Sequence, residues 1–168
     1  MTARLLQLLR ERSFARKKVV LSYGAQSDWF IDCKQTALLA EGHALIGEAL
    51  LAAIRRLPSA VAVAAVELGG CPLASAVALM SYQAGCPLDA IYVRKTAKDH
   101  GSRRPTEGDN AMVEGTPVVV VEDVVTTGSS TLAAVDKLRT RGLTVVGVVA
   151  LVDRGEGGSQ AIQDAGLP

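Results

Sequence analysis

Short apolar runs alternate with stretches of helical periodicity along most of this chain. Runs of small or β-branched residues that are apolar on both faces are typical of the buried strands of a parallel sheet. They predict strands at residues 60–66, 90–93, 118–121 and 143–152. Apolar positions at helical spacing predict helices at residues 36–57, 73–83 and 131–141. Strands that alternate with helices imply right-handed βαβ crossovers, so the predicted fold class is α/β with a parallel sheet.

Three further segments lie outside this alternation. The N-terminal sequence TARLLQLLRER predicts a short amphipathic helix. Residues 19–21 and 29–31 predict two short strands that pair as a hairpin around residues 22–28. Residues 95–114 form a long polar stretch without periodicity. A loop of that length inside a compact domain is usually functional or disordered.

The composition limits the class of protein. A length of 168 residues suits a single domain, residues 1–168, with a substantial core. A net charge of +1 and 4% aromatic residues argue against a nucleic-acid surface of basic patches and stacking aromatics. Three cysteines are an odd number, unlike a disulfide framework, and indicate reduced thiols in a cytoplasmic protein. No segment predicts a signal peptide or a membrane span, because charges or prolines interrupt each apolar stretch.

The sequence VVVVEDVVTTGSS, residues 118–130, joins a buried strand to a candidate anion-binding turn. Burying unpaired charge is costly, so we expect the strand to end at Glu122 and Asp123, with both carboxylates facing a polyol or a metal. The TTGSS segment comes just before a predicted helix, where backbone N–H groups can form a phosphate cradle. No lysine follows the glycine, so this is not the nucleotide-binding P-loop. Alone, the pattern also fits a helix start capped by Thr or Ser.

Several predicted strands are followed by residues that suit ligand binding. Ligands of open α/β sheets bind at the carboxyl ends of the strands, near the reversal of strand order. We therefore expect four segments to converge there, at residues 67–72, 94 onward, 122–130 and 153–154. The second of them carries a cluster of basic residues that is either a solvated loop or an anion clamp: Arg94, Lys95, Lys98, His100, Arg103 and Arg104.

Together these segments resemble the type I phosphoribosyltransferases, and within them the orotate-using branch. The acid pair followed by TTGSS is similar to the family's motif for 5-phosphoribosyl 1-diphosphate (PRPP). IYVRKTAKDHG at residues 91–101 is similar to the mobile catalytic loop, and ALVDRGEGG at residues 150–158 to the turn whose arginine meets orotate. VLSYGAQSDWFIDCK at residues 20–34 is similar to the front segment. The resemblance spans residues 19–166.

The resemblance implies a type I phosphoribosyltransferase fold with a small N-terminal hood segment, a mobile catalytic loop and a C-terminus that is short relative to the family. It implies transfer of the phosphoribosyl group of PRPP to orotate, giving orotidine 5'-monophosphate and pyrophosphate, with Mg²⁺ as cofactor. It also implies a homodimer whose loop is shared between subunits, with no nucleic-acid or membrane partner. Two positions depart from the pattern, since some members carry a lysine at Gly69 and a basic residue at Tyr23.

The resemblance also implies a role for single residues. The catalytic residues are then Lys98, His100 and Asp123, with Lys98 nearest the charge that develops on the leaving group. The 5-phosphate is held by Thr126, Thr127, Gly128, Ser129 and Ser130, after Val124 and Val125. Glu122 and Asp123 accept the ribose hydroxyls and face the Mg²⁺ bound to PRPP. Pyrophosphate is clamped by Arg94, Lys95, Lys98 and His100, and Gly69 and Gly70 let the backbone approach it. Arg154 binds the orotate carboxylate through its fork of donors, and Phe30, beside Trp29, covers the base.

Each assignment has an ordinary alternative. Asp153 and Arg154 also fit a local salt bridge, and Trp29 with Phe30 fits a part of the core. Lys98 and His100 also fit two solvated loop residues. For the whole chain, the alternatives are a PRPP-binding regulator with little catalysis and a phosphoribosyltransferase for a purine or uracil.

Overall fold

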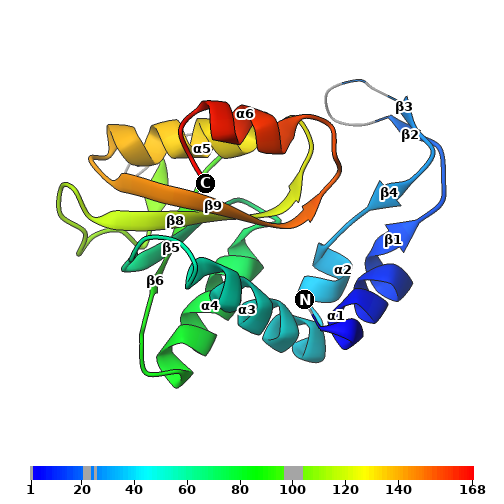
Figure 1. Ribbon diagram of the computed structural model, residues 1–168, viewed down its shortest axis with the longest axis horizontal. Coiled ribbons are helices and arrows are strands. Elements are labelled where there is room, and N and C mark those ends of the chain that lie inside the picture. The colour runs from blue at the N-terminus through cyan, green and yellow to red at the C-terminus, as the bar shows by residue number, and fades with distance from the viewer. Residues whose placement is uncertain (1, 21–23, 25, 97–103) are drawn as a thin grey trace.

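The structure, a computed structural model, describes residues 2–20, 24, 26–96 and 104–168. Its middle layer is a five-stranded sheet in the order β7–β6–β5–β8–β9 (Figure 1). Four of these strands run parallel: β5 (Ala62–Val66), β6 (Asp89–Val93), β8 (Pro117–Val125) and β9 (Thr144–Asp153). The short edge strand β7 (Thr106–Glu107) pairs antiparallel with β6. The predicted α/β class with a parallel sheet is confirmed.

Helices cover both faces of the sheet (Figure 1). One face carries α3 (Ala40–Ile54) and α4 (Cys71–Gln83), and the other carries α5 (Ser129–Thr140) and α6 (Gly158–Asp164). The valines of β8 divide between the two cores, because side chains alternate along a strand. Val119 and Val121 pack with the first pair of helices, whereas Val118 and Val120 pack with the second. This double burial explains the uninterrupted apolar run.

The strand order places a crevice at one edge of the sheet. From the middle strand β5 the chain passes through α4 to β6 on one side, whereas β8 lies on the other side. The order of strands therefore reverses between the carboxyl ends of β5 and β8, which is where ligands of open α/β sheets bind. β8 extends beyond its pairing with β5, so Glu122, Val124 and Val125 pair with β9 alone.

The front segment differs from the predicted hairpin. A short helix, α1 (Ala3–Leu8), continues as one π-helical turn, η1 (Leu9–Ser13). Four two-residue strands follow: β1 (Phe14–Ala15), β2 (Val19–Val20), β3 (Gln26–Ser27) and β4 (Phe30–Ile31). β2 pairs with β3, and β4 pairs with β1. The predicted pairing of residues 19–21 with 29–31 is wrong. Paired residues move away from a hairpin turn by equal steps on both strands, so residues 19–20 pair with 26–27, and residues 30–31 lie opposite 14–15.

Two further expectations from the sequence are corrected. The helix predicted at residues 36–57 is two helices, α2 (Lys34–Ala37) and α3, separated by Leu39 in an extended conformation. Gly42 allows the start of α3 to lie close against α2, since a Cβ there would overlap the carbonyl oxygen of Thr36. The polar stretch at residues 95–114 is also not featureless, because it contains β7.

A buried carboxylate, Asp109, fixes the second half of that polar stretch to Arg141, the C-cap of α5. Asp109 is 1% exposed and accepts hydrogen bonds from the Thr106 hydroxyl at 2.9 Å and from Arg141 Nε at 2.8 Å. A buried charge requires such partners, because an unpaired one is costly in a core. The sequence shows only a polar run here, so this anchor could not be read from it.

Candidate functional site

The loop after β5 and the end of β8 meet at the reversal of strand order. A Cβ at Gly69 would overlap the carboxylate of Asp123, and a Cβ at Gly70 would lie 2.8 Å from that of Ala65. A side chain at Gly69 would displace the Asp123 carboxylate, and one at Gly70 would collide with β5, so glycine keeps the loop close to both strands. The structure therefore brings Gly69 and Asp123 together, as the sequence predicts, whereas Gly70 packs against Ala65 and Val66 of β5.

The two adjacent acids lie on opposite faces of β8, which corrects the expectation that the strand ends there and both face a ligand. β8 continues to Val125, and side chains alternate along it. Asp123 is half-buried beside the glycine loop, and its Oδ1 accepts the backbone N–H of Val124 at 2.9 Å. Glu122 is 4% exposed and points toward the start of α5.

The Glu122 carboxylate is satisfied inside the protein. It accepts hydrogen bonds from the hydroxyl of Thr131 at 3.1 Å, the hydroxyl of Ser130 at 3.4 Å and the backbone N–H of Asp123 at 3.3 Å. Burial, and then the neighbouring Asp123 charge, raise the pKa of Glu122 to about 7. Two ionised carboxylates are thus disfavoured at this position near neutral pH.

The segment between β8 and α5 has the form of an anion cradle. Gly128 caps the helix with a φ of 80°, and Ser129 is its first residue. The hydroxyls of Thr127 and Ser129 lie 2.9 Å apart on the surface. The first N–H groups of a helix have no partner within it and favour anions. Residues 126–130 thus form the turn and helix start that follow β8, and they stay a prediction as the phosphate-binding segment.

The glycine turn after β9 packs against the backbone of this cradle and supports it. The sequence did not predict this contact. A Cβ at Gly158 would overlap Val125 Cγ1 and lie 2.5 Å from the Thr126 carbonyl oxygen. A Cβ at Gly128 would in turn lie 3.1 Å from the Gly158 carbonyl oxygen. The pair of glycines in GEGG was the available signal, since close backbone packing requires glycine.

Arg154 lies at the carboxyl end of β9, enclosed by the front segment. Its side chain is 3% exposed, and its Nε donates to Glu156 Oε1 at 2.7 Å. Its Nη2 donates to the Ser27 hydroxyl at 3.0 Å, and its guanidinium stacks 3.7 Å from the centre of the Trp29 ring. Residues from β3 and the following turn therefore meet Arg154.

The alternative of an Asp153–Arg154 salt bridge is not what the structure shows. Asp153 instead accepts the Gly155 N–H at 2.8 Å and the Ser159 hydroxyl. The acid paired with Arg154 is Glu156, which the sequence reading did not single out. Phe30 lies under the Lys17 ammonium, which is 4.6 Å from its ring centre, so Trp29 is the aromatic residue that contacts Arg154.

The start of the basic loop lies next to the anion cradle. A cavity of about 130 Å³ is lined by Arg94, Lys95, Ser130 and Lys137, among other residues. Arg94 is tied to Glu107 at 2.9 Å and is 3.9 Å from Glu67, whereas the Lys95 N–H donates to Glu67 at 2.8 Å. Lys98 and His100 lie outside the described residues.

Lys137 fixes the backbone at the point where this basic loop begins. Its ammonium donates to the carbonyl oxygens of Arg94 at 2.7 Å and of Lys95 at 2.9 Å. Nothing in the sequence singled out Lys137, since it reads as one of the basic residues common in the last turn of a helix.

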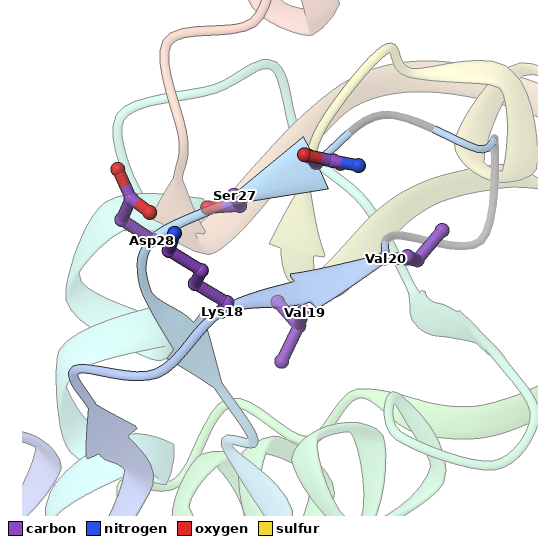
Figure 2. A pocket seen from close by; sticks show the side chains of 6 residues that line it. Lys18, Val19, Val20, Ser27 and Asp28 are labelled. Carbon is purple, nitrogen blue, oxygen red and sulfur yellow. The ribbon is translucent and has the colours of Figure 1, made fainter.

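A larger cavity, of about 340 Å³, lies along the β2–β3 hairpin (Figure 2). Lys18, Ser27 and Asp28 line it with Val19, Val20 and Gln26. None of the predicted site residues is among these, but Ser27 also contacts Arg154. This cavity therefore adjoins the Arg154 site without containing it.

Other features of the described residues bear on cofactors and membranes. These residues contain no group of three or more His, Cys, Asp or Glu side chains that could by itself hold a metal. No helix among them is long and apolar enough to cross a membrane. The three cysteines are free thiols, and burial, then Asp123 and Asp32, raise the pKa of Cys33 to about 12, so it is not a nucleophile at neutral pH.

Comparisons with known proteins agree on one family. The model of the phosphoribosyl transferase domain matches residues 35–164. The orotate phosphoribosyltransferase of Sorangium cellulosum is 64% identical over 165 residues, which are 98% of this chain and 86% of that protein.

Two solved structures extend the comparison to the fold. The Mycobacterium tuberculosis orotate phosphoribosyltransferase, in complex with Fe(III) dicitrate, matches with a TM-score of 0.82 and 38% identity, covering 98% of this chain and 91% of that one. A structure of the same enzyme in complex with PRPP matches with a TM-score of 0.77 and 34% identity, over 98% and 83% of the two chains.

Proposed function

Since this chain belongs to the phosphoribosyltransferase family, in its orotate phosphoribosyltransferase branch, we propose that it transfers the phosphoribosyl group of PRPP to orotate. The products are orotidine 5'-monophosphate and pyrophosphate. In the reaction the bond from the anomeric carbon to the pyrophosphate oxygen breaks, and a bond from that carbon to a ring nitrogen of orotate forms. This reaction needs little proton transfer, so positioning and electrostatic stabilisation supply most of the rate enhancement.

The observation that carries the proposal is the meeting of three backbone and side-chain elements at one crevice. Gly69 brings the loop after β5 against the Asp123 carboxylate, and α5 starts at Ser129, six residues after Asp123 in the chain. A sugar bearing phosphates at both ends requires such an arrangement. One end binds at a helix N-terminus, the hydroxyls bind a carboxylate, and the other end approaches a glycine backbone.

We assign the ribose contact to Asp123 and a supporting role to Glu122. Asp123 is half-buried at the crevice, whereas Glu122 is enclosed under α5. Through Ser130 and Thr131, Glu122 holds the first turn of the helix whose N–H groups would bind the 5-phosphate. Of the two acids, we therefore expect Asp123 alone to contact the sugar.

Mg²⁺ fits this site as an ion that arrives with PRPP. Mg²⁺ keeps several waters and binds through one or two carboxylates together with substrate phosphates, so no cluster of protein ligands is needed. Asp123 supplies such a carboxylate at the crevice, which agrees with the lack of a larger acidic cluster among the described residues. When bound, the ion would offset the negative charge of pyrophosphate.

We assign the pyrophosphate clamp to Lys95, Lys98 and His100, with Arg94 in a supporting role. The two acids near Arg94 compete for its charge, whereas no such ion pair of Lys95 occurs among the described residues. By family resemblance, Lys98 and His100 act across a homodimer, each loop serving the neighbouring subunit. The free thiols support a cytoplasmic location.

A product assay with several bases tests the proposed reaction. The purified protein is incubated with PRPP, Mg²⁺ and, separately, orotate, uracil, adenine or guanine, and the nucleotides are separated by chromatography. We expect orotidine 5'-monophosphate from orotate and no comparable product from the other bases. Conversion of another base but not orotate would assign a different substrate, and PRPP binding without any product would indicate a regulator.

A further inference from the structure

The guanidinium that would receive the orotate carboxylate is already occupied by a carboxylate of this chain. Glu156 Oε1 accepts from Arg154 Nε at 2.7 Å, Ser27 accepts from its Nη2, and Trp29 covers one face. With only 3% of the Arg154 side chain exposed, no substrate can reach it in this arrangement. Binding at Arg154 therefore requires one of its partners to leave.

Glu156 is the partner that can leave most easily. It sits between Gly155 and Gly157, both of which have positive φ, and a Cβ at either would meet no atom within 4 Å. Its side chain is 26% exposed, so its carboxylate can regain water when it leaves the arginine. Trp29, in contrast, packs against Phe14 with ring centres 5.8 Å apart. A partly exposed ion pair of this kind contributes little to stability.

We propose that Glu156 competes within the chain for Arg154, and that the base binds by exchanging its own carboxylate for that of Glu156. The inference rests on the proposed function. The exchange keeps the buried guanidinium paired with an anion before and after binding, which avoids an uncompensated buried charge. A base without a carboxylate, such as uracil, offers no anion to take the place of Glu156. Glu156 thus lowers the affinity for orotate, while a base without a carboxylate leaves Glu156 in place.

Trp29 provides a readout that does not depend on catalysis. It is the single tryptophan of the chain and stacks directly on Arg154, so its fluorescence reports the occupancy of that guanidinium. The wild type, Glu156→Gln and Glu156→Ala are titrated with orotate and with uracil, and KM and kcat for orotate are measured alongside. Asp164→Asn is the matched control, because it removes one negative charge from the helix that follows the turn.

The expected result is a KM and dissociation constant for orotate about fivefold lower in both Glu156 variants, as for the loss of a partly exposed ion pair. Both Glu156 variants should respond to uracil as weakly as the wild type does. The KM and dissociation constant of Asp164→Asn for orotate should equal those of the wild type. In an Arg154→Ala background, Glu156→Gln should change nothing, because Glu156 acts through Arg154. An unchanged or raised KM for orotate in the Glu156 variants would mean that Glu156 only orients Arg154, and would overturn the inference. Failure of the wild type to convert orotate would overturn the proposed function itself, and the inference with it.

Discussion

The backbone of Gly69 lies so close to the carboxylate of Asp123 that no methyl group fits between them, since a Cβ at Gly69 would overlap Asp123 Oδ2. Gly69 lies in the loop after β5 and Asp123 in β8, so their contact spans the reversal of strand order. The carboxylate assigned to the ribose is therefore positioned by the absence of a side chain on the neighbouring loop.

Gly69→Ala should displace the Asp123 carboxylate and lower kcat/KM about a hundredfold, since small displacements at a reacting centre have effects of that order. Steady-state kinetics with orotate and PRPP would measure the loss. Gly85→Ala is the control for backbone strain away from the site, because φ there is 73° and a Cβ meets open space. Equal activity of Gly69→Ala and the wild type would show that the position of Asp123 is not critical.

The raised pKa of Glu122 predicts a pH dependence of stability. The folded pKa of about 7 lies above the ordinary glutamate value of 4.5, so the folded state favours the protonated carboxyl. This contribution is complete below pH 4.5 and is lost as the pH rises through 7, by roughly 3 kcal/mol at most. Urea unfolding of the wild type and Glu122→Gln between pH 4.5 and 8 would compare them. As the pH rises, the free energy of unfolding of Glu122→Gln should increase relative to that of the wild type. A pH-independent difference between the two free energies would contradict the raised pKa.

Gly158→Ala should disturb the anion cradle, because its Cβ would overlap Val125 Cγ1. Overpacking of this kind costs about 1–3 kcal/mol, and the displaced turn should raise KM for PRPP more than KM for orotate. Thermal unfolding and kinetics in both substrates would measure these effects. Gly166→Ala is the control without overlap, because a Cβ there meets no atom within 4 Å, while its φ of 78° adds a backbone strain that Gly158→Ala lacks. A similar KM for PRPP in both variants would argue against support of the cradle by Gly158.

Arg141→Ala should destabilise the fold by about 2–3 kcal/mol, because Asp109 would remain buried without its cationic partner. Arg141 itself is one-third exposed, which places the effect below that of a fully buried pair. Denaturant unfolding measures the change. Arg139→Ala, at an exposed position in the last turn of α5, should stay within about 0.5 kcal/mol of the wild type. If Arg141→Ala also lost no more than about 0.5 kcal/mol, the Asp109 carboxylate would be satisfied without Arg141.

The proposed sharing of the loop between subunits predicts complementation. Lys98→Ala and Asp123→Ala should each be nearly inactive as homodimers, since both remove transition-state interactions. A random mixture that exchanges subunits is about half heterodimer, and each heterodimer has one intact site of two. Activity should then recover to roughly a quarter of wild type if the sites are independent. Verified exchange without recovery would show that each loop serves its own subunit.

The regular elements of the fold were accessible from the sequence, and the details of the front segment were not. The valines of β8 predicted a doubly buried strand because both faces of that strand pack against helices. The break between α2 and α3 was missed because helical periodicity continues across it, whereas the break depends on the contact of Gly42 with Thr36. Local patterns do not contain such tertiary contacts.

The candidate site shows the same division. TTGSS and the glycine loop were recognised from local composition, and the structure brings Gly69 and Asp123 together as expected. The separation of Glu122 from Asp123 was missed, because the cost of burying charge suggested that the strand ends before them. Partners from α5 make that burial possible. Likewise Glu156, two residues from Arg154, could not be identified as its partner without the geometry of the turn.

Helix α5 joins the two regions assigned to opposite ends of PRPP. It begins at Ser129, directly after the N-cap Gly128 in the anion cradle, and two turns later Lys137 holds the carbonyl oxygens of residues 94 and 95. Because those contacts are to main-chain atoms, they place few limits on the side chains that follow them. For protein engineering, this makes residues 128–140 and the basic loop one transplantable module. A chimaera that imports a relative's loop should retain Lys137, while the loop sequence itself can vary.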